Sequence, residues 1–163
     1  MLKFSLSVKL TNSIRNLSFK EVLRGTRLND LFQHPELAQK LGTFQDFQLM
    51  QEPAFIGLKD VHSEIIDESL VAFRDNPLMN KPTQEAVVLA TLTQQNPYGG
   101  ASLVAERIKH YAKQQGLPTQ HAAAHWFDAY CRHAVVPLFD LQANWGIVFL
   151  AHQQNIVMQL ETH

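Results

Sequence analysis

The chain has one cysteine, no long apolar run and almost no net charge, and these features exclude several classes of protein. Cys131 alone cannot form an internal disulfide, which excludes a disulfide-stapled secreted scaffold and fits a reducing compartment. No stretch approaches the roughly 20 apolar residues that span a bilayer, and the N-terminus lacks the apolar segment of a signal peptide. We therefore expect a cytoplasmic protein without a membrane partner, in which Cys131 is a buried thiol.

The composition is that of an ordinary globular protein. With 163 residues, of which 45% are hydrophobic and 18% charged, the chain can build one domain with a core, and extended disorder is excluded. The formal net charge is −1, but residues 1–27 carry six basic side chains against one acidic residue, Glu21. A local cationic surface on a near-neutral chain favours a small anionic ligand over a nucleic acid, although a solvated basic face explains the charges equally well.

The N-terminus alternates apolar and polar residues with a period of two, the pattern of a strand with one buried face and one polar face. Because a lone strand has unpaired edges, a strand that starts at the first residue suggests a chain cut from a longer one. Two further short strands are predicted at 44–49 and 54–58. The alternating apolar residues are Leu2, Phe4, Leu6, Val8 and Leu10.

Helix signals dominate the remainder of the chain. Ser18 and Glu21 have capping-box spacing for a short helix that ends at Gly25. A second helix is predicted at 28–41, interrupted or restarted near Pro35. From residue 82 onward we expect mainly helices: 84–94, 102–115, one capped by Thr119, and an apolar continuation from 137 to about 151. Residues 156–158 resemble the start of a strand.

These elements predict an α+β fold, with N-terminal strands of a small antiparallel sheet followed by a mainly helical C-terminal half. Trp126 and Phe127 recur at helical spacing and are expected in the core. His121 and His125 share a helical face at a spacing known from zinc sites, but the acid that a metalloprotease needs is absent, so we interpret them as solvated. The glycines at 99–100 lack the spacing and lysine of a phosphate loop and fit a helix entry.

Two clusters of polar residues are candidates for ligand binding. Thr11, Asn12 and Arg15 follow the N-terminal strand, and the planar guanidinium of Arg15 suits a carboxylate or a phosphate. Near the other end, an imidazole and two amides follow an apolar helical run at His152, Gln154 and Asn155. Burying such groups without partners costs roughly 1 to 3 kcal/mol each, which indicates that something polar meets them there.

The order of these motifs resembles one known family. The strand Leu-Lys-Phe-Ser-Leu that leads to Thr-Asn-x-x-Arg, and the later Gly-Ile-x-x-x-Ala-His-x-Gln-Asn, are similar to the siderophore synthetases that work independently of nonribosomal peptide synthetases, a family that includes aerobactin synthase. The resemblance covers essentially the whole chain. It implies a fragment of a larger, multi-lobed synthetase, with residues 1–81 in a strand-containing part of the ATP-binding lobe. Residues 82–163 would be a helical part of a palm-like lobe that ends in the His-x-Gln-Asn motif.

The resemblance also implies the chemistry. A carboxylate of citrate or a related polyacid would be adenylated by ATP with magnesium, and an amine or hydroxyl would then displace AMP. Arg15 and His152 would be catalytic and would contact the reacting phosphate and carboxylate. The cofactor-binding residues would be Lys3, Thr11, Asn12, Gln154 and Asn155, with Asn155 also the metal ligand.

The chain departs from the family pattern in three respects. Leu150 stands where members have an acidic residue, and a leucine cannot bind magnesium, which takes oxygen ligands. The family's motif segments before the strand and after the His-x-Gln-Asn motif lie outside this chain. A straight strand would place Lys3 roughly 26 Å from Thr11, so either the strand bends or the two residues serve different ends of an extended nucleotide, and Lys9 is the fallback cation.

Two other hypotheses remain open at this stage. The chain could be a truncated, inactive homologue that acts as a binding or interaction domain, for which Leu150 is the best argument. It could also be a generic mixed domain that matches the motifs by chance. A surface left uncovered in a fragment could promote self-association, so a homo-oligomer is a possible state.

Overall fold

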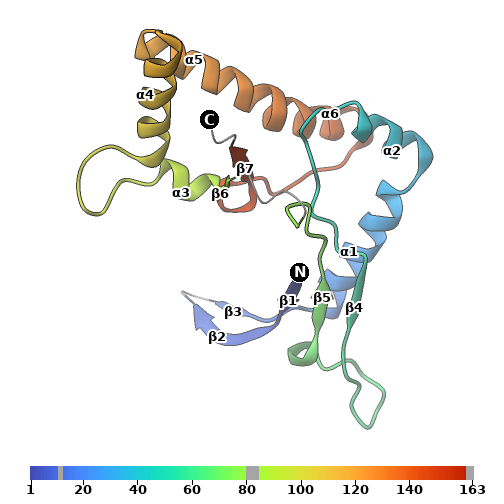
Figure 1. Ribbon diagram of the computed structural model, residues 1–163. Coiled ribbons are helices and arrows are strands. Elements are labelled where there is room, and N and C mark those ends of the chain that lie inside the picture. The colour runs from blue at the N-terminus through green and yellow to red at the C-terminus, as the bar shows by residue number, and fades with distance from the viewer. Residues whose placement is uncertain (11–12, 80–84, 161–163) are drawn as a thin grey trace. The chain divides into compact units, whose positions relative to one another are not determined.

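The computed structural model describes residues 1–10, 13–79 and 85–160, with the side chains of residues 10 and 13–15 excepted. The chain forms two compact units (Figure 1). The first comprises Met1–Phe44 and Gln48–Met79, and the second comprises Gln45–Phe47 and Asn80–His163. The fold is α+β with small antiparallel sheets, as the sequence predicts. Within the described residues, no helix has the length and apolar character needed to cross a membrane.

The first unit contains two separate sheets. Strands β1 (Leu2–Phe4), β5 (Val71–Phe73) and β4 (Ala54–Ile56) form an antiparallel sheet with β5 in the middle. Strands β2 (Leu6–Leu10) and β3 (Ser13–Arg15) form their own antiparallel pair. The single strand predicted for residues 2–10 is therefore two strands that belong to different sheets.

Ser5 marks the break between these two strands. Its hydroxyl donates to the carbonyl of Asp67 at 2.8 Å, and the backbone N–H of Leu17 donates to the same hydroxyl at 2.9 Å. The Asp67 carbonyl belongs to a 3-10 turn, Asp67–Ser69, that precedes β5. These two hydrogen bonds fix the position of Ser5 between the strands. β1 therefore pairs in the three-stranded sheet, and β2 pairs in a separate sheet.

Helices α1 (Phe19–Phe32) and α2 (Pro35–Gly42) follow the strands. Ser18 and Glu21 form both bonds of the predicted capping box, and Pro35 begins α2 where its missing N–H costs nothing. The predicted end of α1 at Gly25 is wrong. A Cβ at that position would lie 3.0 Å from Oε2 of Glu52, so this glycine allows a close contact inside the helix instead of ending it.

The core of the first unit lies between α1 and one face of the three-stranded sheet. Val22 of α1 packs with Ala72 of β5, and the Phe19 ring meets Phe55 edge-on at 5.8 Å. The predicted burial of the N-terminal apolar residues is wrong, since α1 packs on the face that carries Ala72 and Phe55. In β1 the alternate residues Leu2 and Phe4 point the other way, with exposed fractions of 54% and 60%. Leu6 and Val8, on the separate strand β2, are 49% and 50% exposed.

The second unit is mainly helical. It contains α3 (Leu89–Thr93), α4 (Leu103–Gln115), α5 (Thr119–Tyr130) and α6 (Val136–Trp145), with a π-helical turn at Cys131–Val135 between the last two. The helix predicted at 102–115 is confirmed as α4, with Ser102 as its N-cap and Gly116 ending it in the left-handed conformation. Pro137 lies in the first turn of α6, directly after the π-helical turn, and Val135 and Val136 keep right-handed helical dihedral angles.

Several further predictions are wrong in detail. Residues 44–49 contain no strand, and residues 85–88 form strand β6 (Glu85–Val88), paired antiparallel with β7 (Val157–Leu160), where a helix was predicted. The β-branched residues Val87 and Val88 favour a strand, and β7 is the strand with which they pair.

Helix α5 begins with Pro118 as its cap rather than Thr119. Phe127 is 67% exposed rather than in the core, and Cys131 is half-buried.

Candidate functional site

The His-x-Gln-Asn motif lies on an exposed turn, not at the end of a helix. Helix α6 stops at Trp145 because Gly146 adopts the left-handed conformation at φ 66°, six residues before the predicted end. Residues 147–152 then run without regular structure into a 3-10 turn, Gln153–Asn155, that leads into β7. The turn contacts α3, whose Thr93 hydroxyl donates to Oε1 of Gln153 at 3.3 Å.

Within this turn the side chains of His152 and Asn155 contact each other. The Nδ2 group of Asn155 lies 3.3 Å from Nε2 of His152 and donates to the carbonyl of Leu150 at 2.8 Å. A backbone bond from the Asn155 N–H to the His152 carbonyl, 2.8 Å long, closes the turn. Three short contacts, all within residues 150–155, therefore hold the amide and the imidazole in place.

The four residues from His152 to Asn155 are all exposed. The expectation that these polar groups are buried is wrong for this chain, because the helix that would have carried them inward ends at Trp145. Their exposure leaves them accessible to a ligand, and Gln154 carries a second amide on the same turn.

A hollow of about 270 Å³ adjoins this turn. Ala151 and Ile156, which bracket the motif in the chain, form part of its wall, and Gln142 is its one side-chain amide. The polar turn thus borders a mainly apolar hollow. The other lining residues come from the π-helical turn, α6 and nearby segments: Tyr130, Val135, Leu138, Phe139 and Phe149.

The candidate cations of the first unit have different surroundings. Lys3 on β1 lies with its Nζ 3.4 Å from Oε1 of Glu52, and Arg74 donates to the same oxygen from Nη2 at 2.6 Å and from Nε at 3.1 Å. Burial raises the pKa of Glu52, but the hydrogen bond from Arg74 and the positive charges of Lys3 and Arg74 outweigh it and hold that pKa below its ordinary value. The cluster of Lys3, Glu52 and Arg74 was missed in the sequence, because its members are 22 to 71 residues apart and share no motif.

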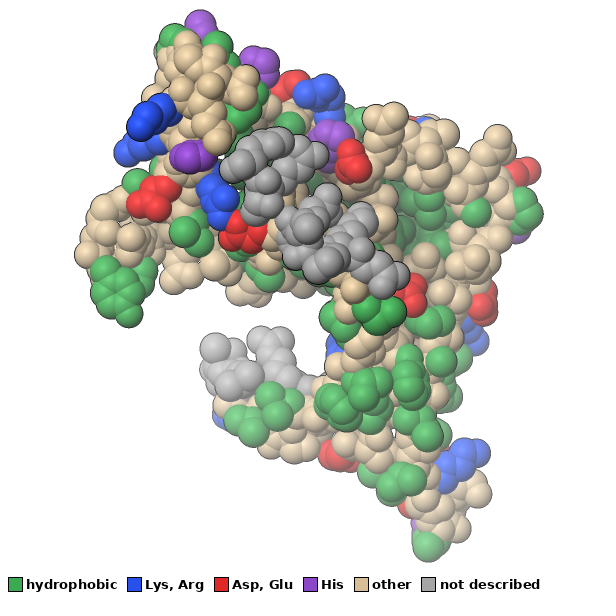
Figure 2. Space-filling view, viewed as in Figure 1, with side chains coloured by type: hydrophobic (Ala, Val, Ile, Leu, Met, Phe, Trp, Pro, Cys, Tyr) green, Lys and Arg blue, Asp and Glu red, His purple; other side chains and the backbone are tan. Residues whose placement is uncertain are grey.

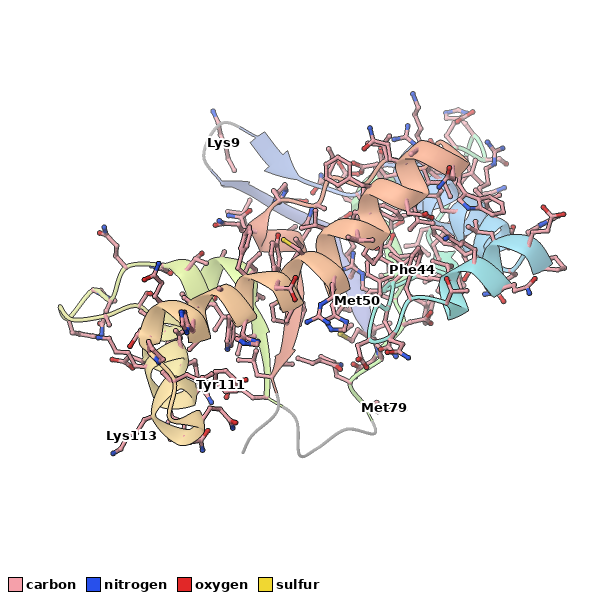
Figure 3. All side chains as sticks on the ribbon, turned by 90° about the horizontal axis from the view of Figure 1, so that it is seen from above. Lys9, Phe44, Met50, Met79, Tyr111 and Lys113 are labelled. Atoms are coloured by element: carbon pink, nitrogen blue, oxygen red, sulfur yellow. The ribbon has the colours of Figure 1, made fainter. Side chains whose placement is uncertain are left out.

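Lys9 is exposed near the end of the β2–β3 hairpin, where its side chain extends away from the ribbon (Figure 3). The backbone of Arg15 pairs with Leu6 in that hairpin. The side chain of Arg15, and all of Thr11 and Asn12, lie outside the described residues. The candidate residues thus fall into two sets, one in each unit, and the convergence of Arg15 with His152 stays a prediction.

The described residues contain no group of three or more His, Cys, Asp or Glu side chains that could hold a metal ion. Leu150, at the position of the missing acid, is 82% exposed. Asn155 could offer its amide oxygen, since its nitrogen is engaged by Leu150 and His152. His121 and His125 lie on an exposed stripe of α5.

Comparison with known proteins agrees with the motifs. A family model described as the IucA / IucC family matches residues 1–94, and one described as a ferric iron reductase FhuF-like transporter matches residues 124–163. The chain is 79% identical over 161 residues to N(2)-citryl-N(6)-acetyl-N(6)-hydroxylysine synthase of Vibrio mimicus, covering 99% of this chain and 27% of that protein. It is 44% identical to the Escherichia coli protein of the same name, covering 98% of this chain and 28% of the relative.

A solved structure is similar over the same range. ATP-bound aerobactin synthetase IucA from a hypervirulent pathotype of Klebsiella pneumoniae matches with a TM-score of 0.93 and 46% identity, covering 98% of this chain and 29% of that one. The chain therefore spans little more than a quarter of the length of the relatives that it matches.

Proposed function

Because the chain belongs to the IucA/IucC family, we propose that it is part of an ATP-dependent synthetase that joins a carboxylate of citrate, or of a related polyacid, to an amine or hydroxyl group. The observation that carries this proposal is the 79% identity to a citryl-hydroxylysine synthase over nearly the whole chain. The similarity to an ATP-bound synthetase, at a TM-score of 0.93, supports ATP as the co-substrate. The single cysteine fits a cytoplasmic location.

The reaction proceeds in two steps. A carboxylate oxygen of the polyacid attacks the α-phosphorus of ATP, and pyrophosphate leaves, which produces an acyl-adenylate. The amine or hydroxyl of the second substrate then attacks the acyl carbon, loses its proton and displaces AMP. Two anions have to approach each other in the first step, so donors and cations that face the reacting oxygens lower its barrier most.

In this proposal the chain supplies several of these groups. Arg15 binds the reacting phosphate with its guanidinium, and His152 donates to the carboxylate or to the developing phosphoanhydride. Thr11, Asn12 and Gln154 add neutral hydrogen bonds to the nucleotide. The exposure of the His152 turn is compatible with this role, since a ligand can reach it.

Two candidates have narrower roles. Lys3 is already paired with Glu52, so Lys9, which is exposed, is the freer cation for a phosphate. Magnesium would be held mainly by the phosphates of ATP, a usual arrangement for this ion, with the amide oxygen of Asn155 as one protein ligand. No step of the proposed reaction depends on a metal site within the described residues.

The test uses the longer protein that contains this chain. Replacing Arg15→Ala or His152→Ala should reduce citrate-dependent AMP formation on the order of a hundredfold, the loss typical when a transition-state donor is removed. The measurement is the rate of AMP release with ATP, magnesium and citrate.

Matched controls are available in each unit. Arg24→Ala removes an exposed arginine of α1, and His125→Ala removes an exposed histidine of α5, and both variants should keep the parent rate. Unchanged AMP formation in both Arg15→Ala and His152→Ala would contradict the roles proposed for these residues.

A further inference from the structure

The contact between Asn155 and His152 determines which way the Asn155 amide points. Its Nδ2 lies 2.8 Å from the carbonyl oxygen of Leu150, and a carbonyl oxygen can only accept. If the amide were turned over, its own oxygen would face that carbonyl at the same distance and the two would repel. The nitrogen therefore faces Leu150. The two orientations of the amide have the same shape, so the hydrogen bond to Leu150 is what distinguishes them.

The same nitrogen has a second proton to donate. It lies 3.3 Å from Nε2 of His152, and an amide nitrogen has no lone pair free to accept a hydrogen bond. For this contact to be a hydrogen bond, Nε2 has to be the acceptor and carry no proton. In a neutral imidazole one ring nitrogen donates and the other accepts, so the proton resides on Nδ1.

The geometry of the turn keeps the two side chains in place. The backbone N–H of Asn155 donates to the carbonyl of His152 at 2.8 Å, which sets the separation of the two residues. The bond from Thr93 to Gln153, 3.3 Å long, ties the intervening residue to α3. These two bonds therefore hold Asn155 next to the imidazole of His152.

We propose that Asn155 is a positioning residue that holds His152 as the neutral tautomer with its proton on Nδ1, so that the ring presents a hydrogen-bond donor to an anionic oxygen of the ligand. The proposal rests on the function proposed above for the His152 turn. Carboxylate and phosphate oxygens only accept, and Nδ1–H is the ring group that can donate to them while Nε2 is engaged. His152 then acts as a fixed donor toward the ligand, and its Nε2 is not the base that removes the proton of the amine or hydroxyl.

The tautomer can be measured directly on the 163-residue chain. Long-range proton–nitrogen correlation spectra of ¹⁵N-labelled histidine side chains distinguish the protonated from the unprotonated ring nitrogen. Assignment of His152 comes from the signals that disappear in His152→Gln. In the parent protein, with the ring neutral, we expect a protonated Nδ1 and an unprotonated Nε2.

Substitution of Asn155 provides the decisive comparison. Asn155→Asp replaces a donor by a group that only accepts when ionised, so the ring proton should move to Nε2 and the signals of the two nitrogens should exchange places. The matched control is Asn144→Asp, which alters an asparagine of α6 bonded to Asp140 and should leave the His152 signals unchanged. His152 and Asn155 are both exposed, so these variants leave the buried residues intact.

A parent spectrum with the proton on Nε2, or an Asn155→Asp spectrum identical to that of the parent, would overturn the proposal. The measurement needs neither ATP nor citrate. A negative result therefore leaves the proposed synthetase activity standing, and a failure of the AMP assay leaves the tautomer assignment standing.

Discussion

At the scale of single residues, Glu52 contacts residues from three separate segments of the first unit. Its carboxylate accepts from Arg74 and Lys3, and it lies so close to α1 that a Cβ at position 25 would be 3.0 Å from its Oε2. Its side chain is only 15% exposed, so loss of its charge leaves two cations without their shared partner in a partly desolvated place.

The lowered pKa of Glu52 predicts a pH dependence of stability. A carboxylate with a folded-state pKa below its unfolded value of 4.5 stabilises the fold above that pH, and this contribution is lost as the pH falls through the folded-state pKa. Glu52→Gln should lower the free energy of unfolding by about 1–2 kcal/mol at neutral pH, because the ion pairs are partly exposed. Urea denaturation at neutral and acidic pH measures the difference.

In acid, where Glu52 is protonated in the folded and the unfolded protein, the parent and Glu52→Gln should have nearly equal stability. Glu64→Gln, which alters an exposed carboxylate of the same unit, should follow the parent at every pH. A parent-to-Glu52→Gln difference that stays constant as the pH falls would contradict this assignment.

At the scale of elements, the three-stranded sheet has two unequal faces. α1 covers the face of Phe55 and Ala72, and the opposite face carries large apolar side chains in register across β1, β5 and β4. Figure 2 shows hydrophobic side chains gathered over these strands. A cluster of this kind is unusual for the surface of a monomer and marks a place where apolar surface remains open to a partner. The members are Leu2, Phe4, Ile56 and Phe73, exposed at 54%, 60%, 59% and 43%.

The exposed face predicts binding of an apolar dye. The native chain should enhance the fluorescence of anilinonaphthalene sulfonate, and the double variant Phe4→Ser with Ile56→Thr should reduce that enhancement several-fold, because the patch loses its two most exposed members. Circular dichroism verifies that the variant remains folded.

Val61→Ser offers a comparison for the dye experiment. Val61 is 94% exposed on a loop of the same unit but lies outside the sheet, so its loss should leave the fluorescence unchanged. Equal enhancement in the parent and the double variant would show that the sheet face is not the dye site.

At the scale of the whole molecule, the candidate residues belong to two different units. Arg15 and Lys9 belong to the first unit, while His152, Gln154 and Asn155 belong to the second. The relatives that share this region are more than three times as long. A reaction that brings two anions together needs its donors in one pocket, so we expect segments beyond this chain to contribute to it.

The 163-residue chain alone should therefore form AMP from ATP and citrate at less than about a hundredth of the rate per molecule of the longer protein that contains it. Chromatographic measurement of AMP, with magnesium and both proteins at equal concentration, gives the comparison. A comparable rate for the short chain would show that it contains the complete site.

The sequence predicted best those features whose cause lies within a few residues. The capping box of Ser18 and Glu21 and the start of α2 at Pro35 both depend on groups within one helical turn, and so does the helix predicted at 102–115. The family resemblance is likewise a property of motifs in the chain, and the matching family model confirms it. The roles assigned to Arg15, His152 and the other site residues stay predictions.

The tertiary structure decided what depends on a distant partner. Ser5 breaks the N-terminal strand because Asp67 and Leu17 bind its hydroxyl, and residues 85–88 form a strand because β7 lies beside them. The apolar alternation of residues 2–8 fitted a strand, yet it could not reveal which face α1 would cover. Sequence by itself determined the family, the fold class and the local caps, while burial, strand partners and the contact of Asn155 with His152 arose from packing, because each requires groups that only the folded chain brings together.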